Sequence, residues 1–308
     1  MIRQIMYEAR DYSSACGADS ANQEMKTEVF GQFDREVKIT HVQASGARMR
    51  VAQIGTGPDI VWVPGGDSPA EAWRQQMMLF AGEYRSTSYD PRGVGETTSD
   101  AAPWSIADFA RDCAELIESI CTPPVILSGL SMGGLITQQV AIDYPHLVQL
   151  AIPMGTSAYI DGFTRDWMEA EVQLRRDGIS LPDYFLAPHY AAYALPAKAL
   201  GDSEIWGSVK PAYTVRFSER EPQDLIHQWQ ACLDFDCREA LRTCPVPMHV
   251  IAFAEDVQTP PAMVKEVADL AMHGTFYELP ELGHVSVARH RADDVNRLLL
   301  DIIQTQSG

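Results

Sequence analysis

A serine flanked by glycines lies near the middle of the chain, in Gly129-Leu130-Ser131-Met132-Gly133-Gly134. The apolar run before it, Val125-Ile126-Leu127-Ser128, predicts a buried strand, and the apolar spacing after it predicts a helix that ends near Pro145. A serine on such a strand-to-helix turn is held in a strained conformation with its hydroxyl exposed, and this requires small residues two positions before and after it. We therefore predict that Ser131 is a nucleophile.

A serine hydroxyl becomes a nucleophile only when a neighbouring base takes its proton. Of the eight histidines, His284 has the most suitable position, in Glu281-Leu282-Gly283-His284-Val285. This segment follows the last apolar strand of the pattern and precedes the closing helix. It is therefore expected at the same edge of the sheet as Ser131, and His284 is the predicted base.

The base needs an acid that fixes its tautomer. Residues 254–260 follow a predicted strand and offer two carboxylates, Glu255 and Asp256. Asp256 is preferred because the turn that contains it continues into Thr259-Pro260 and is directed at the sheet edge. Glu255 is the second choice, and Asp161 is another possible source.

The oxyanion formed in acyl transfer needs backbone N–H donors that are already in place. One predicted donor is the N–H of Met132, directly after the nucleophile, and the other is that of Gly66 in Pro64-Gly65-Gly66-Asp67. The sequence has no H-E-x-x-H motif and no cysteine–histidine cluster at zinc spacing, so we expect no metal and no other cofactor.

The elements that position these residues alternate between strands and helices, which predicts a wound, mostly parallel α/β sheet. Apolar or alternating runs predict strands near residues 37–41, 49–54, 60–63, 84–89, 125–128, 150–154, 248–253 and 275–277. Ser105 with Asp108 predicts a capped helix whose buried stripe begins at Ile106 and Phe109. A final helix is expected around residues 295–303.

The strand signal disappears between residues 155 and 242, where helical stretches are expected at Asp166–Arg176 and from Pro222 onwards. We predict that residues 155–242 form a helical lid, inserted between core segments 34–154 and 243–308. Aromatic side chains in this segment are expected to line an apolar pocket above the serine. Trp167 and Tyr159, together with Gly65, are the predicted substrate contacts.

Bulk composition excludes several functional classes. The 308 residues carry a formal net charge of -18, which repels nucleic acid and anionic membranes, and no apolar run is long enough to span a bilayer. Six cysteines without a C-x-x-C pair, and no signal-peptide pattern, predict reduced thiols in a cytoplasmic protein. Residues 1–33 are expected to form an extension that either lies loosely or packs on a second subunit of a homodimer.

These motifs, in this order, resemble the α/β-hydrolase fold superfamily from about residue 35 onwards. The resemblance includes Pro64-Gly65-Gly66, Asp90-Pro91-Arg92-Gly93-Val94-Gly95, the Ser131 motif, Asp256 and Gly283-His284. It is greatest to bacterial ester and lactone hydrolases of the enol-lactonase type. Two positions depart from that pattern: Pro64 replaces a frequent histidine and Phe253 a frequent glycine. Both leave the predicted triad intact.

The leading hypothesis is therefore a serine hydrolase that cleaves a carboxylic ester or lactone of a small, largely apolar molecule through an acyl-serine. A carbon–carbon bond hydrolase of a vinylogous diketone is the second enzymatic hypothesis, although such enzymes often carry an aromatic residue where this chain has Val285. Thioester and amide cleavage stay open. A ligand receptor without catalysis and a perhydrolase or cofactor-free oxygenase are the remaining alternatives.

Overall fold

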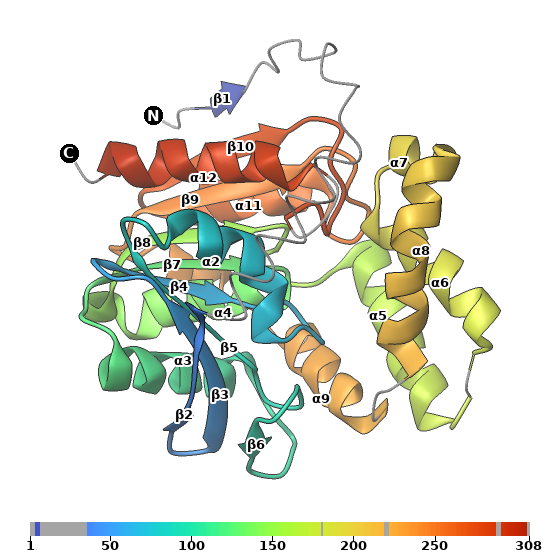
Figure 1. Ribbon diagram of the computed structural model, residues 1–308, viewed down its shortest axis with the longest axis horizontal. Helices are drawn as coiled ribbons and strands as arrows, with labels where there is room; N and C mark the ends of the chain where they lie inside the picture. The colour runs from blue at the N-terminus through green and yellow to red at the C-terminus, as the bar shows by residue number, and fades with distance from the viewer. Residues whose placement is uncertain (1–3, 7–35, 180, 219–221, 288–290, 307–308) are drawn as a thin grey trace.

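The computed structural model describes residues 4–6, 36–179, 181–218, 222–287 and 291–306. A ten-stranded sheet crosses the centre of this part of the chain (Figure 1). Its strands are β1 (Gln4–Met6), β2 (Lys38–Gln43), β3 (Ala47–Ile54), β4 (Asp59–Val63), β5 (Arg85–Tyr89), β6 (Thr98–Ser99), β7 (Val125–Leu130), β8 (Val148–Met154), β9 (Met248–Phe253) and β10 (Gly274–Leu279).

The strands follow the order β1-β10-β9-β8-β7-β4-β5-β3-β2, with β6 beside β3. The first seven strands of this path, β1, β10, β9, β8, β7, β4 and β5, run parallel to one another, whereas β3, β2 and β6 are antiparallel to their neighbours. Strands β4 and β7 are buried along nearly their whole length, which explains their almost continuous apolar sequences. The predicted mostly parallel sheet is confirmed.

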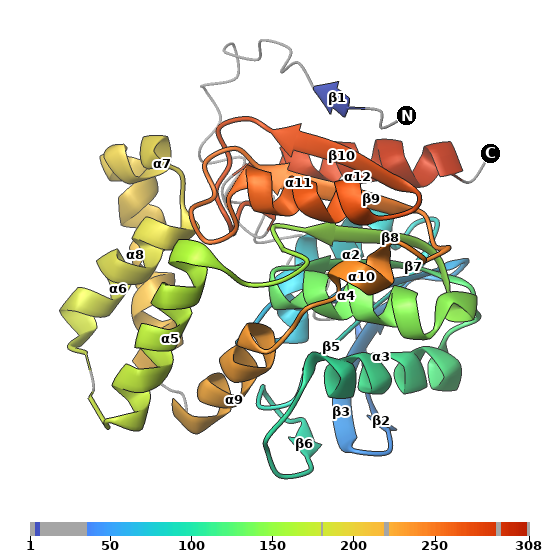
Figure 2. The same ribbon diagram turned by 180° about the vertical axis from the view of Figure 1, so that it is seen from behind.

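Helices cover both faces of the sheet (Figures 1 and 2). One face carries η1 (Ala70–Trp73), α2 (Arg74–Phe80) and α12 (Ala292–Gln306); the other carries α3 (Ile106–Ile120), α4 (Met132–Asp143), η2 (Pro145–Leu147), α10 (Arg238–Leu241) and α11 (Pro261–Leu270). Each face has its own apolar core, one around Phe109 and Leu135 and the other around Trp62 and Leu298. The sheet therefore separates two cores, as in other three-layer α/β proteins.

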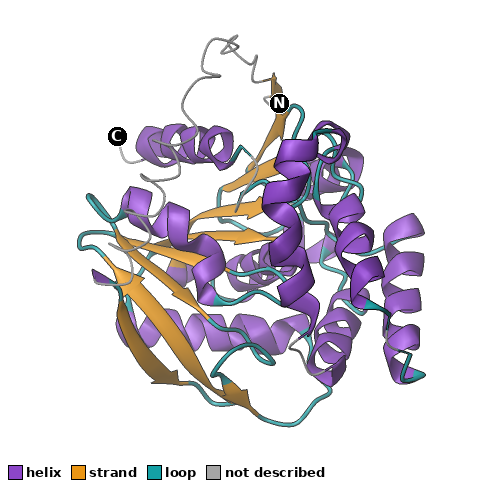
Figure 3. Ribbon diagram, turned by 45° about the vertical axis from the view of Figure 1, so that its right-hand side comes forward, coloured by secondary structure: helices purple, strands orange, loops and turns teal. Residues whose placement is uncertain are grey.

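A second group of helices lies to one side of the sheet, beyond the carboxyl ends of its parallel strands (Figure 3). It comprises α5 (Gly162–Arg176), α6 (Asp183–Ala194), α7 (Ala197–Gly201), α8 (Ser203–Ser218) and α9 (Pro222–Leu233), and these helices are called the lid below. They fall inside the predicted segment 155–242. Helices α6 to α8 share a small core of their own that includes Tyr190 and Tyr213.

Several local predictions are confirmed, and others are not. Ser105 and Asp108 form the predicted capping box at the start of α3, because each side chain accepts from the backbone N–H of the other. Helix α5 begins four residues earlier than predicted. In β2 the buried side chain is Val42, and Ile39 is exposed, because only one face of this edge strand packs on the core.

The N-terminal extension falls mostly outside the described residues. Gln4–Met6 form the short strand β1, which pairs in parallel with β10 at one edge of the sheet. This strand was not predicted, because three residues are too few for any alternation of polar and apolar side chains to be visible.

Candidate active site

Ser131 occupies the turn between β7 and α4, near the middle of the sheet. Its backbone has φ 58° and ψ −122°, a combination that is costly for a residue with a side chain. The turn is fixed by hydrogen bonds from the N–H of Ser131 to the carbonyl of Met154 and from the hydroxyl of Thr156 to the carbonyl of Ser131, both 3.0 Å long. The strained conformation is therefore held by the neighbouring strand β8.

The glycines around Ser131 allow two segments of backbone to pass very close to one another. A Cβ on Gly129 would overlap the carbonyl oxygen of Gly133, and a Cβ on Gly133 would overlap the carbonyl oxygen of Val63. Neither clash involves a flexible side-chain tip, so neither can be relieved by a change of rotamer. The small residues that the sequence predicted at these two positions are thus required by close packing.

Asp256 and His284 follow two adjacent parallel strands, β9 and β10, and therefore reach the same sheet edge as Ser131. His284 Nδ1 lies 2.7 Å from Asp256 Oδ2, and both residues are buried. The same carboxyl group accepts hydrogen bonds from the N–H groups of Gln258 and Thr259 and from the hydroxyl of Thr259, at 2.8–3.0 Å. Together with His284 Nδ1, these groups place four hydrogen-bond donors around the carboxyl group of Asp256.

This arrangement determines the tautomer of the imidazole. An ionised carboxylate can only accept hydrogen bonds, so His284 Nδ1 must carry the proton that it shares with Asp256. The other ring nitrogen, Nε2, is then free to accept a proton. His284 and Ser131 line one pocket, and no hydrogen bond joins their side chains in the described part of the chain. In enzymes without bound substrate, catalytic hydrogen bonds of this kind are often long and shorten when substrate binds.

The two alternative acids have other partners. Glu255 Oε2 accepts from the backbone N–H of Ala197 at 2.9 Å, which attaches the start of α7 to the core. Asp161 lies at the start of α5, and its carboxyl group is 3.5 Å from the hydroxyl of Tyr159. Of the three carboxylates that the sequence offered, Asp256 is the one that the structure places against His284.

The loop after β4 passes directly over the nucleophile turn. A Cβ on Gly65 would lie 3.5 Å from Ser131 Cβ, and a Cβ on Gly66 would lie 3.9 Å from Met132 Cβ. Both predicted oxyanion donors, Gly66 and Met132, line the same pocket as Ser131. Met132 is the first residue of α4, where N–H groups have no partner within the helix and the helix dipole favours negative charge. The arrangement suits the stabilisation of an oxyanion.

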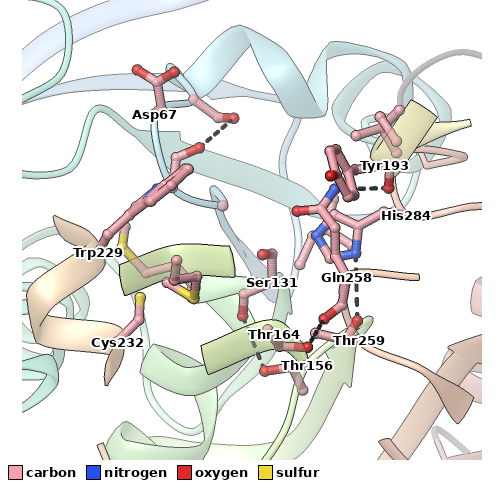
Figure 4. A pocket seen from close by; sticks show the side chains of 18 of the residues that line it. Asp67, Ser131, Thr156, Thr164, Tyr193, Trp229, Cys232, Gln258, Thr259 and His284 are labelled. Atoms are coloured by element: carbon pink, nitrogen blue, oxygen red, sulfur yellow. Dashed lines mark hydrogen bonds between the residues drawn. The ribbon is translucent and has the colours of Figure 1, made fainter. Parts of the chain in front are cut away.

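The pocket has a volume of about 150 Å³ and extends from the sheet edge into the lid (Figure 4). Gly65 and Trp167 line it, as predicted from the sequence. The ring of Trp167 stacks on Tyr193 at 4.9 Å and packs on Trp229 at 5.3 Å between centroids. The wall is therefore largely aromatic on the lid side.

Tyr159 is not among the residues that line this pocket, so its prediction as a substrate contact is not supported. Its ring lies beneath the guanidinium of Arg238, 3.8 Å from the ring centroid, and its backbone pairs with Asp236. Conversely, sequence reasoning did not single out Trp229, Tyr193 or Gln258, which do line the pocket. Aromatic content identified the lid as a pocket wall, but helical spacing alone does not tell which side of each lid helix faces the serine.

The lid contacts the loops that carry the acid and the base. The hydroxyl of Thr164 donates to the carbonyl of Gln258 at 2.6 Å, and the amide of Gln258 donates to the carbonyl of Tyr193 at 3.0 Å. The N–H of Val285, next to His284, donates to the carbonyl of Ala194 at 3.1 Å. Lid helices α5 and α6 are thus attached to residues directly beside the Asp256–His284 pair.

A buried polar cluster, named the Glu171 cluster here, lies inside the lid and consists of Glu171, Arg175, His189 and Tyr190. Glu171 contacts Arg175 through one oxygen, accepts from the Tyr190 hydroxyl at 2.8 Å, and lies 2.9 Å from His189 Nε2. Burial raises the pKa of Glu171, but hydrogen bonds from Arg175 and His189 outweigh it and hold this pKa below its usual value. Tyr190 also lines the pocket, so the cluster supports its wall.

The cysteines that the structure describes are not joined in disulfides. Five cysteines lie in the described residues and all are free thiols; burial raises the pKa of Cys113, Cys121 and Cys232 to about 12. Cys16 lies outside the described residues. Within the described ranges, no group of three or more His, Cys, Asp or Glu side chains is placed to hold a metal ion. Of the helices described, none has the length and apolar character needed to cross a bilayer.

Comparison with known proteins gives consistent matches over most of the chain. The model of the Alpha/beta hydrolase family matches residues 60–298. A Mycobacterium tuberculosis protein provisionally named non-heme bromoperoxidase BpoC is 29% identical over 248 residues, which cover 80% of this chain and 94% of that protein. The 3-oxoadipate enol-lactonase 2 of Acinetobacter baylyi is 28% identical over 218 residues, or 70% of this chain and 77% of the enzyme.

A solved structure extends the comparison to the fold. The enol-lactonase from Burkholderia xenovorans LB400 superimposes with a TM-score of 0.76, at 20% identity, over 86% of this chain and all of that chain. At this level of identity the likeness concerns the fold alone.

Proposed function

Because the chain belongs to the alpha/beta hydrolase family, we propose that it is a serine hydrolase that cleaves a carboxylic ester or lactone through an acyl-serine intermediate. The single observation that carries this proposal is the buried Asp256–His284 pair, which lies at the sheet edge where Ser131 lines the same pocket. The nucleophile, acid and base follow three separate strands in the chain order Ser131, Asp256 and His284, which is the order of an α/β-hydrolase triad.

In the proposed mechanism, Ser131 Oγ attacks the carbonyl carbon of the substrate while His284 Nε2 takes the hydroxyl proton. Asp256 keeps the proton of Nδ1 in place and stabilises the imidazolium that forms. The N–H groups of Gly66 and Met132 donate to the oxyanion. Collapse of the tetrahedral intermediate releases the alcohol, which takes its proton from His284. Water then attacks the acyl-serine by the same steps, and the acid is released.

The pocket supports a small, uncharged and largely apolar substrate. Trp167, Tyr193 and Trp229 form much of the lid side, and no lysine or arginine is among the described residues that line the cavity. Asp67 is an acidic lining residue, so an anionic substrate would meet a carboxyl group in the pocket wall. The small volume of the cavity also favours a small substrate.

Turnover of p-nitrophenyl acetate and butyrate, with γ-butyrolactone measured in parallel, tests the proposal. Rapid mixing is expected to give a burst of p-nitrophenolate equal to the enzyme concentration if hydrolysis of the acyl-serine is slower than its formation. Ser131→Ala is expected to abolish both burst and steady state. Ester turnover that persists in Ser131→Ala would exclude the acyl-serine.

One relative gives a reason to test a second activity, because the Mycobacterium tuberculosis protein has a name that refers to peroxide chemistry. The proposed acyl-serine would yield a peracid if hydrogen peroxide replaced water as the attacking group. The peracid would then oxidise bromide to hypobromous acid and become the carboxylic acid. Bromination of monochlorodimedone that requires p-nitrophenyl acetate, hydrogen peroxide and Ser131 together would support this activity.

A carbon–carbon bond hydrolase is the other enzymatic alternative, and thioester cleavage also remains a candidate. Val285, next to His284, has no aromatic ring to offer to a diketone substrate. Parallel assays with a vinylogous diketone and an acyl-thioester distinguish these reactions from ester cleavage. A receptor without catalysis would show no turnover in any of them.

A further inference from the structure

A single buried side chain of the lid, Gln228 on α9, holds two loops of the core together. Its Oε1 accepts from the backbone N–H of Asp67 at 2.7 Å, and its Nε2 donates to the carbonyl oxygen of Arg92 at 2.6 Å. The side chain is 1% exposed, so neither hydrogen bond competes with water. Asp67 and Arg92 are separated from Gln228 by 161 and 136 residues along the chain.

The first of these loops carries the proposed oxyanion donor. Asp67 follows Gly66 directly, and its φ of 62° is unusual for a residue other than glycine. A residue in this region keeps its conformation only where its surroundings hold it. The acceptor that Gln228 offers to the Asp67 N–H is placed to do this. The same hydrogen bond also fixes the peptide group that joins Gly66 to Asp67.

The second loop, which contains Arg92, is itself fixed to the core. Arg92 forms a buried bidentate ion pair with Asp112 of α3, at 2.6 and 2.9 Å. The following residue, Gly93, lies so close to α9 that a Cβ there would come within 2.9 Å of Asp224 Cβ. The ring of His227 on α9 also packs edge-on against Trp104, at 5.6 Å between centroids. Helix α9 is therefore fixed to the core on the side from which Gln228 projects.

We infer that Gln228 is a positioning residue for the oxyanion hole, through which lid helix α9 sets the place of the Gly66 N–H. This inference rests on the proposed function. Gln228 is not a catalytic residue, because its amide oxygen and its amide nitrogen are both hydrogen-bonded to backbone groups. Its contribution is to hold a loop in a conformation that the loop does not favour on its own. Loss of the amide lets the Asp67 peptide relax and moves the Gly66 donor away from the oxyanion.

The test uses the full-length protein with p-nitrophenyl butyrate as substrate. Gln228→Met keeps the length of the side chain and removes both hydrogen bonds. We expect kcat to fall by about tenfold or more with KM within about twofold, because an oxyanion donor acts on the transition state and its complete loss costs about 100-fold to 1,000-fold. Gln228→Glu, which can still accept from the Asp67 N–H, is expected to recover part of kcat.

A second readout separates positioning from a general structural role. Phenylboronic acid forms a tetrahedral adduct on a reactive serine and places an oxygen in the oxyanion hole, whereas benzyl alcohol forms no adduct. The affinity of Gln228→Met for the boronic acid is expected to fall by about the same factor as kcat, and its affinity for benzyl alcohol to stay unchanged. Gln230→Met is the matched control. Its side chain lies on the same helix but bonds to Arg176 and Asp234, away from the loop.

A value of kcat within twofold of wild type in Gln228→Met would overturn the inference, as would equal loss of affinity for the boronic acid and the alcohol. If Gln228→Met does not fold, Gln228→Asn is judged by the same criteria, since its amide is one methylene too short to reach both partners. Failure of the proposed function is distinguishable. In that case the wild-type protein itself would show no ester turnover and no boronic acid inhibition.

Discussion

His284 Nδ1 and Asp256 Oδ2 are 2.7 Å apart, and the two side chains are 5% and 0% exposed. Water therefore does not compete for this hydrogen bond, and the imidazole is held in one orientation and one tautomer. The remaining lone pairs of the carboxylate are occupied by Gln258 and Thr259. Such a fully paired, buried charge is costly to disturb, and this makes its removal an informative experiment.

Asp256→Asn preserves the shape of the acid and removes its charge. An asparagine oxygen or nitrogen can pair with either tautomer of His284, so the base loses its fixed orientation. We expect kcat for ester hydrolysis to fall by roughly 1,000-fold to 10,000-fold. The measurement is steady-state turnover of p-nitrophenyl butyrate, with active sites counted by a phosphonate inhibitor.

Glu255→Gln is the control for Asp256→Asn, since Glu255 precedes Asp256 directly but contacts the start of α7 instead of His284. Its kcat is expected to stay close to that of wild type. A larger loss in Glu255→Gln than in Asp256→Asn would show that the acid has been assigned to the wrong carboxylate.

Gly133→Ala places a methyl group against the carbonyl oxygen of Val63, where neither backbone can move without displacing β4 or α4. We expect the free energy of unfolding to fall by about 3 kcal/mol, at the upper end of the cost of overpacking. Esterase activity is expected to be lost as well, because Val63 directly precedes the loop that carries Gly66, the proposed oxyanion donor. Urea denaturation and activity measured on the same samples provide the check.

Gly82→Ala is the matched substitution in open space, since a Cβ there has no neighbour within 4 Å. Its stability and activity are expected to equal those of wild type. If Gly133→Ala were equally harmless, close packing would not explain the glycines of the Ser131 turn.

Much of this fold and of the candidate site is readable from the sequence, because the relevant constraints are local. Close backbone packing around Ser131 requires glycine at positions 129 and 133, and the strand before Ser131 begins with the apolar run Val125-Ile126-Leu127. Those features are visible within a dozen residues. The placement of His284 after the last long strand follows from the parallel order of the sheet, which alternation predicts.

The features that sequence reasoning missed are those that depend on packing between distant segments. In the sequence, Gln228 is one of several polar residues in a helix. Its contacts with Asp67 and Arg92 exist only because α9 packs against both loops. Tyr159 is an aromatic residue at the start of the lid segment, yet Arg238 rather than the pocket covers its ring. Helical spacing specifies a face but not which neighbour that face meets, so lining residues of a helical lid are not predictable from one chain.

Trp167→Ala removes the ring that packs between Tyr193 and Trp229 in the pocket wall. We expect KM for p-nitrophenyl butyrate to rise by about tenfold, which corresponds to a loss of about 1.4 kcal/mol of binding. The value of kcat should change less than KM, because a ring in the pocket wall is expected to contribute equally to binding of the ground state and of the transition state.

Tyr159→Ala serves as the comparison for Trp167→Ala, since both remove an aromatic ring from the segment after β8 but only Trp167 lines the pocket. Its KM is expected to equal that of wild type. A tenfold rise of KM in Tyr159→Ala would restore Tyr159 as a substrate contact.

The Glu171 cluster gives a prediction for pH dependence. Because the pKa of Glu171 in the folded protein lies below its usual value of 4.5, the fold favours the ionised carboxylate. Its stabilising contribution is therefore present above pH 4.5 and is lost as the pH falls through the lower, folded-state pKa. Glu171→Gln is expected to have a lower melting temperature than the wild-type protein at pH 7. The difference in melting temperature between the two proteins is expected to become smaller as the pH falls below 4.5. A difference that does not change between pH 7 and pH 3 would contradict this assignment.

Labelling with a fluorophosphonate probe tests the central claim, that Ser131 is a nucleophile activated by His284. We predict one adduct per chain in the wild-type protein, located on Ser131 by peptide mass spectrometry. Labelling should be absent in Ser131→Ala and at least 1,000-fold slower in His284→Ala, roughly the loss expected when a triad member is removed. An adduct on another residue, or labelling of Ser131→Ala at the wild-type rate, would contradict the account.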